Sequence, residues 1–152
     1  LLILDEPTNH MNFRHLPAIT IGDFAKNTYP DNFTDIVICM EVLEHIPPRI
    51  TKDFIAQLSR ITRPGGRLLI STSEDWEVDK THVNCRKRAE WYYLFSQAGL
   101  VPVGKQVIFP GFNSFVMKKS RHVFIKWIWK NLATLRYHIH STIQRRDERL
   151  TN

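Results

Sequence analysis

The sequence predicts an α/β fold in which a mostly parallel sheet is closed by an antiparallel pair of strands. Short apolar segments alternate with segments of helical periodicity, in the order strand, strand, strand, helix, strand, helix, strand, strand. Strands that alternate with helices form right-handed parallel crossovers and a layered sheet. The 152 residues, 43% hydrophobic and 24% charged, suffice for one globular domain with its own core.

The first half of the chain carries three short apolar runs, which predict strands over 1–4, 18–21 and 35–40. The third run is apolar on both faces, as in a parallel sheet that is covered on both sides. A helix is expected over 52–61, with Thr51 as its N-cap. This helix is predicted by apolar residues at helical spacing: Phe54, Ile55, Leu58 and Ile61.

The second half continues the alternation. We expect Pro64-Gly65-Gly66 to end the helix and turn the chain into a strand over 67–72. A polar loop over 73–82 and a helix over 84–98 should follow. The remaining segments predict one strand that comprises 100–103 and 106–109 and another over 114–117, with an antiparallel turn at Pro110-Gly111.

Charge divides the chain into two predicted parts. Residues 1–117, the expected domain, hold 12 Lys and Arg against 13 Asp and Glu, whereas residues 118–152 hold 9 against 2. The basic character therefore belongs to the tail, and we do not expect the protein to bind nucleic acid. The two cysteines, Cys39 and Cys85, form no disulfide scaffold, and no secretory signal opens the chain, so a cytoplasmic setting is expected.

The tail predicts a basic amphipathic helix over 121–146. Its apolar stripe consists of Phe124, Ile128, Leu132, Leu135, Ile139 and Ile143. Trp127, Trp129 and five basic residues accompany it: Lys126, Lys130, Arg136, Arg145 and Arg146. Such a helix can lie peripherally on an anionic membrane. We expect instead that the stripe packs on the domain or covers the substrate mouth, because most amphipathic helices of soluble chains bury their stripe.

Two segments together resemble a known family. One is a strand that ends in Glu41-Val42-Leu43-Glu44-His45, and the other is the later Arg60-Ile61-Thr62-Arg63-Pro64-Gly65-Gly66. Their pairing resembles class I S-adenosylmethionine-dependent methyltransferases, and among them the small-molecule O-methyltransferases of ubiquinone biosynthesis. The resemblance covers roughly residues 1–117. It implies a Rossmann-like sheet, S-adenosyl-L-methionine as methyl donor and a small-molecule or lipid-like acceptor.

The resemblance also implies which residues contact the cofactor: Asp5, Glu6, Asp23, Phe24, Met40 and Glu41. An acid after the first strand would accept hydrogen bonds from the ribose hydroxyls. Asp23 would accept from the adenine amine while Phe24 packs on the ring. Met40 and Glu41 would lie beside the methionine end of the cofactor.

One hallmark of that family does not occur in this chain. No Gly-x-Gly-x-Gly loop follows an apolar strand. We expect this loop and its strand to lie upstream of Leu1, and the strand to sit between those over 1–4 and 35–40. The chain would then be an N-terminally truncated fragment. A non-catalytic module that docks to a membrane or partner through its basic tail is the competing hypothesis.

The acids and histidines after the third strand have two chemical interpretations. Glu41, Glu44 and His45 would share a face if the segment were helical, and could then hold Mg²⁺ or a transition metal. Alternatively, His45 could take the proton from an attacking hydroxyl as general base. His82, in the later polar loop, is a second candidate base or substrate contact.

A competing motif opens the chain. Residues 1–10, LLILDEPTNH, resemble the Walker B segment of ATP-binding-cassette ATPases, in which the Asp holds Mg²⁺ and the Glu orients water. The match spans ten residues, and no Gly-x-x-x-x-Gly-Lys-[Ser/Thr] loop accompanies it. We therefore interpret it as coincidence or as a junction of unrelated coding sequence.

Overall fold

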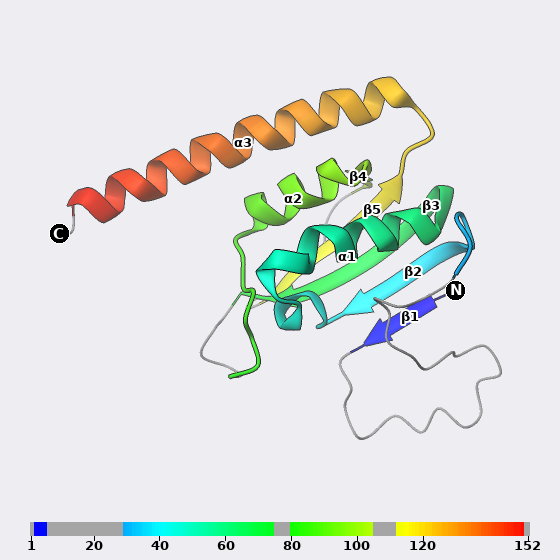
Figure 1. Ribbon diagram of the computed structural model, residues 1–152. Helices are drawn as coiled ribbons and strands as arrows, with labels where there is room; N and C mark the ends of the chain where they lie inside the picture. Colours follow the sequence, from blue (N-terminus) through cyan, green and yellow to red (C-terminus); the bar gives the residue numbers. More distant parts are fainter. Residues whose placement is uncertain (1, 6–28, 75–79, 105–111, 151–152) are drawn as a thin grey trace.

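Five strands build one sheet in the computed structural model, which describes residues 2–5, 29–74, 80–104 and 112–150 (Figure 1). The strands are β1 (Leu2–Asp5), β2 (Thr34–Met40), β3 (Thr62–Ser73), β4 (Leu100–Pro102) and β5 (Phe112–Lys119). The helices are α1 (Pro48–Ile61), α2 (Arg88–Gln97) and α3 (Val123–Leu150), with a 3₁₀ turn, η3, at Leu43–His45.

The sheet order is β1-β2-β3-β5-β4. β1, β2 and β3 run parallel, whereas β5 is antiparallel to both β3 and β4. This arrangement confirms the predicted α/β fold, including its closing antiparallel pair. β1 pairs directly with β2, with Leu4 opposite Cys39. β1 therefore occupies the position beside β2 at which we expected a further strand.

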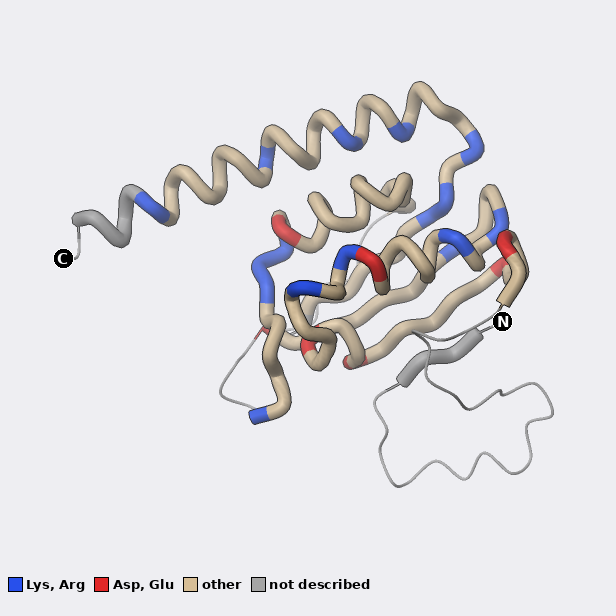
Figure 2. The backbone as a smooth tube through the Cα atoms, viewed as in Figure 1, with Lys and Arg blue, Asp and Glu red and all other residues tan. Residues whose placement is uncertain are grey.

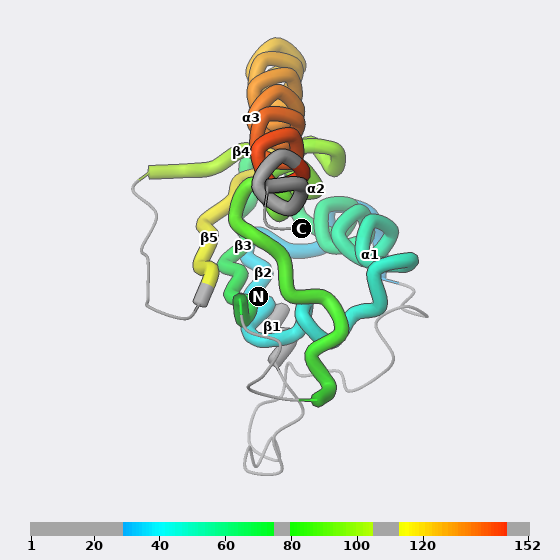
Figure 3. Tube along the Cα trace, turned by 90° about the vertical axis from the view of Figure 1, so that its left-hand side faces the viewer, coloured from blue at the N-terminus to red at the C-terminus, as the bar shows by residue number. Residues whose placement is uncertain are grey.

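The core lies between the sheet and two helices. α1 and α2 lie on the same side of the sheet, and α3 lies over α2 (Figures 1 and 3). The predicted apolar stripe of α1 is buried, as its spacing required. It meets buried residues of α2 and of three strands: Trp91, Phe95, Val37, Cys39, Leu68, Ile70, Phe115 and Met117. One continuous core therefore fixes the strand ends that carry the site.

The start of α1 differs from its prediction. The helix begins at Pro48 rather than Lys52, and it has no side-chain cap. Thr51 lies inside the first turn, where its hydroxyl donates to the carbonyl of Pro47 at 3.0 Å. Proline at the first helical position has φ preset for a helix and no N–H to satisfy, so the helix starts there.

The turn expected at Pro64-Gly65-Gly66 is instead part of β3, which begins at Thr62. Gly65 has φ +93°, a left-handed conformation that favours glycine. A Cβ on Gly66 would come 2.7 Å from the Asp35 carbonyl oxygen. Glycine is therefore required where β3 passes closely beside β2.

Several other expectations concern the later part of the chain. α2 covers Arg88–Gln97 and is therefore shorter than the helix predicted over 84–98. Trp91 of this helix is fully buried. The strands over 100–103 and 114–117 are confirmed as β4 and β5. Three predicted features lie outside the described residues: the strand over 18–21, the continuation of the 100–103 strand over 106–109, and the turn at Pro110-Gly111.

The expected packing of α3 is wrong. α3 contacts α2 through Trp129 and Tyr137, whose rings lie 5.5 Å from that of Tyr92 and 4.6 Å from that of Tyr93. Ala133 between them is buried. The apolar stripe lies on another face of α3 and is exposed. Helical spacing identifies an apolar face but does not say what covers it.

Candidate functional site

Glu41 follows β2 at the carboxyl edge of the sheet in a left-handed backbone conformation, with φ +49°. Its N–H lies 3.1 Å from the carbonyl oxygen of Ser71 and 3.3 Å from the hydroxyl oxygen of the same residue. That hydroxyl donates in turn to Oε1 of Glu41. A left-handed conformation costs a non-glycine residue about 1–2 kcal/mol, and such outliers cluster at functional sites.

Glu44 is a buried carboxylate close to Glu41. Its Oε1 accepts a hydrogen bond from the N–H of Ser73 at 2.9 Å, whereas its Oε2 is buried and has no hydrogen-bond partner among the residues that the structure describes. Burial raises the pKa of the Glu41 carboxyl from 4.5 to about 7, and the negative charge of Glu44 adds to this rise. The Ser71 hydrogen bond and the charge of His82 act in the opposite direction. The site therefore holds a carboxyl group that titrates near neutral pH.

Two imidazoles lie beside these carboxylates. Nδ1 of His45 lies 3.0 Å from Oγ1 of Thr81 and 3.3 Å from the carbonyl oxygen of Thr81. The ring of His82 is edge-on to that of His45, with centroids 5.0 Å apart. The N–H of Val83 donates to the carbonyl of Glu44 at 2.8 Å, which holds this segment against η3.

A buried amide supports the whole arrangement. Nδ2 of Asn84 donates to the carbonyl of Leu43 at 3.0 Å and to Oγ1 of Thr51 at 2.8 Å. It thus ties η3 and α1 to the segment that carries His82. Sequence reasoning missed Asn84. Its neighbours in the chain follow no apolar pattern that would mark it as buried, and its partners Leu43 and Thr51 are distant in the sequence.

The structure changes the predicted metal set. Among the described residues, Glu44, His45 and His82 offer ligand atoms that all lie within 4.8 Å of one another. The expected set had Glu41 in place of His82. Glu44 is near enough to Glu41 for its charge to raise the Glu41 pKa, but the ligand atoms of Glu44 and His45 gather with that of His82 in the later segment. One carboxylate and two imidazoles suit a first-row transition metal better than Mg²⁺.

The predicted cofactor residues are described only in part. Met40 ends β2 with its side chain 38% exposed, next to Glu41. Asp5 ends β1 and pairs with Met40 in the parallel register, which puts both at the carboxyl edge. The Asp5 side chain, Glu6, Asp23 and Phe24 lie outside the described residues. So does the Walker-B-like segment beyond β1.

Membrane crossing can be assessed for the described ranges. Within them, none of the helices combines the length and the apolar character that a bilayer crossing requires.

Comparison with known proteins identifies relatives for most of the chain. The family model described as "Methyltransferase domain" matches residues 6–105. A ubiquinone biosynthesis O-methyltransferase of Aeromonas salmonicida (strain A449) is 41% identical over 54 residues, which are 36% of this chain and 21% of that protein. The Proteus mirabilis (strain HI4320) protein of the same name is 30% identical over 96 residues, 59% of this chain and 34% of that protein. The chain thus spans about a third or less of these relatives.

Solved structures share the fold. A chain of the complex between the Haloferax volcanii Trm112 methyltransferase activator and a methyltransferase superposes with a TM-score of 0.54 at 18% identity, covering 68% of this chain and 61% of that one. A Bacillus halodurans C-125 protein assigned as a methyltransferase gives 0.52 at 16% identity, covering 65% and 76%. The structural likeness concerns the fold, whereas the family model matches the sequence itself. Because that model covers most of the chain, the protein belongs to the methyltransferase domain family.

Proposed function

We propose that this protein transfers the methyl group of S-adenosyl-L-methionine to a hydroxyl oxygen of a small-molecule acceptor. The observation that carries the proposal is the gathering of two carboxyl groups and two imidazoles at the carboxyl edge of β2 and β3. Ligands of open α/β sheets bind outside this edge. The names of the two O-methyltransferases to which the chain is similar favour oxygen as the acceptor atom.

The cofactor contacts that we propose follow the edge of the sheet. They are Asp5, Glu6, Asp23, Phe24, Met40 and Glu41. Met40 is the last residue of β2, and Glu41 follows it. The register of β1 puts Asp5 opposite Met40, which supports a common binding edge. The acids would accept hydrogen bonds from the ribose and the adenine amine, whose N–H and O–H groups can donate.

The chemistry is a single displacement. S-adenosyl-L-methionine supplies a methyl group bound to a positively charged sulfur. The acceptor oxygen forms a bond to the methyl carbon as the carbon–sulfur bond breaks and the sulfur becomes neutral. The acceptor proton must leave, and we propose His82 or His45 as the group that receives it. Positioning and exclusion of water supply most of the acceleration.

A divalent cation is a second way to prepare the acceptor. Glu44, His45 and His82 would hold it, and it would act as a Lewis acid on the acceptor hydroxyl. The residues fit such an ion. The Thr81 carbonyl can only accept, so it favours the hydrogen on Nδ1 of His45 and leaves Nε2 as a ligand, a usual arrangement around metals. Oε2 of Glu44 is a further available ligand atom.

Product formation tests the proposal. The chain is incubated with S-adenosyl-L-methionine and a panel of small phenols, and release of S-adenosylhomocysteine is measured. We expect turnover with at least one phenol and a loss of about a hundredfold or more in His82→Ala. Lys80→Ala is the matched control, because Lys80 is exposed on the same segment. No turnover with any phenol would favour the non-catalytic alternative, and full activity of His82→Ala would remove His82 from the reaction.

A chelator distinguishes proton removal by a histidine from activation of the acceptor by a divalent cation. If the cation contributes, activity falls after treatment with chelator and returns with added Mn²⁺ or Zn²⁺. If a histidine acts alone, chelator has no effect and His82→Ala remains inactive in the presence of either metal.

A further inference from the structure

We propose that α3 docks the protein to an anionic membrane by lying flat on it. The surface that would enter the membrane is the α3 stripe, defined as Phe124, Ile128, Leu132, Leu135, Ile139 and Ile143. This proposal concerns a surface remote from the carboxyl edge and does not depend on methyl transfer.

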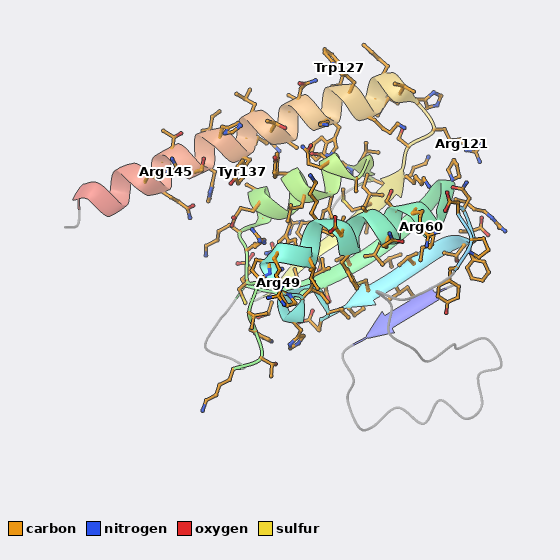
Figure 4. All side chains as sticks on the ribbon, viewed as in Figure 1. Arg49, Arg60, Arg121, Trp127, Tyr137 and Arg145 are labelled. Atoms are coloured by element: carbon orange, nitrogen blue, oxygen red, sulfur yellow. The ribbon has the colours of Figure 1, made fainter. Side chains whose placement is uncertain are left out.

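The α3 stripe is exposed although the helix is packed. α3 uses Trp129, Ala133 and Tyr137 to contact α2, and at about 100° per residue these residues define a face different from that of the stripe. Tyr137 points toward α2 whereas Trp127 points away from the sheet (Figure 4). The stripe residues have high exposed fractions for apolar side chains: Phe124 69%, Ile128 38%, Leu132 50%, Leu135 57%, Ile139 52% and Ile143 54%. A contiguous apolar surface of this kind marks an interaction site.

The charges of α3 identify the chemistry of the partner. Residues 123–146 contain five basic residues and no Asp or Glu. Figure 2 shows Lys and Arg spaced along the coloured part of α3, which carries no acidic residue; Asp147 and Glu148 follow at the C-terminal end of the helix. Helical spacing puts Arg136 on one flank of the stripe and Arg145 on the other. An apolar face with basic flanks is the pattern of helices that lie in the interface of anionic bilayers.

An aromatic residue and a groove extend this surface. Trp127 is 62% exposed, and tryptophan favours the depth of the lipid headgroups. Beside the stripe, a groove of about 390 Å³ between α2 and α3 is lined by Arg88, Tyr92, Arg136, Ile139 and Ile143, among others. The groove combines apolar side chains with Arg88 and Arg136. This combination suits the boundary between the acyl chains and the anionic headgroups of a membrane.

A second copy of the chain fits the surface less well. Two paired α3 helices would bring their basic residues together, and the only carboxylates in the sequence of α3 are those of Asp147 and Glu148 at its C-terminal end. Like charges across an interface are unfavourable. Anionic lipid supplies the missing negative charge.

Vesicle sedimentation tests the proposal. The 152-residue chain is mixed with vesicles of phosphatidylcholine alone, or of phosphatidylcholine with phosphatidylglycerol at about 7:3. We expect pelleting with the anionic vesicles, little with the neutral ones, and release at high salt. The pair Leu132→Gln and Leu135→Gln in one protein should weaken binding by about tenfold or more, because both side chains are exposed in the free protein and buried in the bilayer.

Charge is tested with a matched pair of substitutions. Arg136→Gln removes a charge beside the stripe and should weaken binding about fivefold. Lys130→Gln removes the same charge from the opposite side of the helix and should have a clearly smaller effect, because the electrostatic interaction falls off within a Debye length. Circular dichroism and gel filtration of each variant verify that the fold is retained.

Three results would overturn the proposal. The first is native protein that stays in the supernatant with anionic vesicles at low salt. The second is equal pelleting with neutral and anionic vesicles. The third is a stable dimer in gel filtration that the Leu132→Gln and Leu135→Gln pair dissociates, which would identify a second copy as the occupant of the stripe.

Discussion

Replacing Glu41 by glutamine should make the protein more stable, and increasingly so as the pH rises. Burial and the nearby Glu44 raise the pKa of Glu41 from 4.5 to about 7 in the folded protein. Between these values the Glu41 carboxyl binds more protons in the folded state than in the unfolded state, so its contribution to stability falls as the pH increases from about 4.5 to about 7. Glutamine is neutral throughout and lacks this loss.

The magnitude follows from the change in pKa. A rise from 4.5 to about 7 corresponds to about 3.4 kcal/mol if it were fully expressed. Because Glu41 is only partly buried, solvent screening reduces this, and we expect about 1–2 kcal/mol. Glutamine can also accept from the Ser71 hydroxyl and donate to Oε2 of Glu44, so the substitution leaves the local hydrogen bonds satisfiable.

Urea unfolding at about pH 5 and about pH 8, with chelator present to keep the site metal-free, measures the effect. The free energy of unfolding of Glu41→Gln, relative to the native protein, should rise by about 1–2 kcal/mol between the two pH values. Glu74→Gln, at an exposed position just after β3, is the control and should show a much smaller change. The reasoning is refuted if Glu41→Gln and the native protein differ by the same amount at both pH values.

Two further stability predictions follow from the structure. Gly66→Ala should destabilise the protein by about 2 kcal/mol or more in urea unfolding, because the new Cβ would meet the Asp35 carbonyl oxygen at 2.7 Å; unchanged stability would show that the strands separate easily there. Asn84→Ala should cost about 1–3 kcal/mol, since it leaves the Leu43 carbonyl and the Thr51 hydroxyl without their donor. If Asn84→Ala kept full stability, the amide would have no anchoring role.

The sequence predicted the strands and helices whose patterns are local. β2 is a continuous β-branched and apolar segment, and the α1 stripe repeats at helical spacing, so both could be recognised without knowledge of the rest of the fold. The start of α1 was misplaced because Thr51 resembles a cap. In the structure this hydroxyl instead serves the carbonyl of Pro47 and the amide of Asn84.

The errors concern contacts between distant segments. His82 joins Glu44 and His45 because the segment after β3 is held against η3, and no spacing along the chain encodes that approach. The α3 stripe was expected to be buried, yet Trp129 and Tyr137 form the contact with α2. The contact consists of one edge-on and one stacked ring pair, and it depends on the tyrosines that α2 presents, which the spacing within α3 cannot reveal.

Calorimetric titration of the chain with S-adenosylhomocysteine tests the proposed cofactor edge most directly. We expect binding in the micromolar range, weakened by about 1–3 kcal/mol in Asp23→Ala through loss of a charge-assisted hydrogen bond. Asp53→Ala, at an exposed position of α1, should bind like the native protein. Absence of binding heat with the native chain, or an unchanged affinity in Asp23→Ala, would contradict the proposal that this edge holds the methyl donor as described.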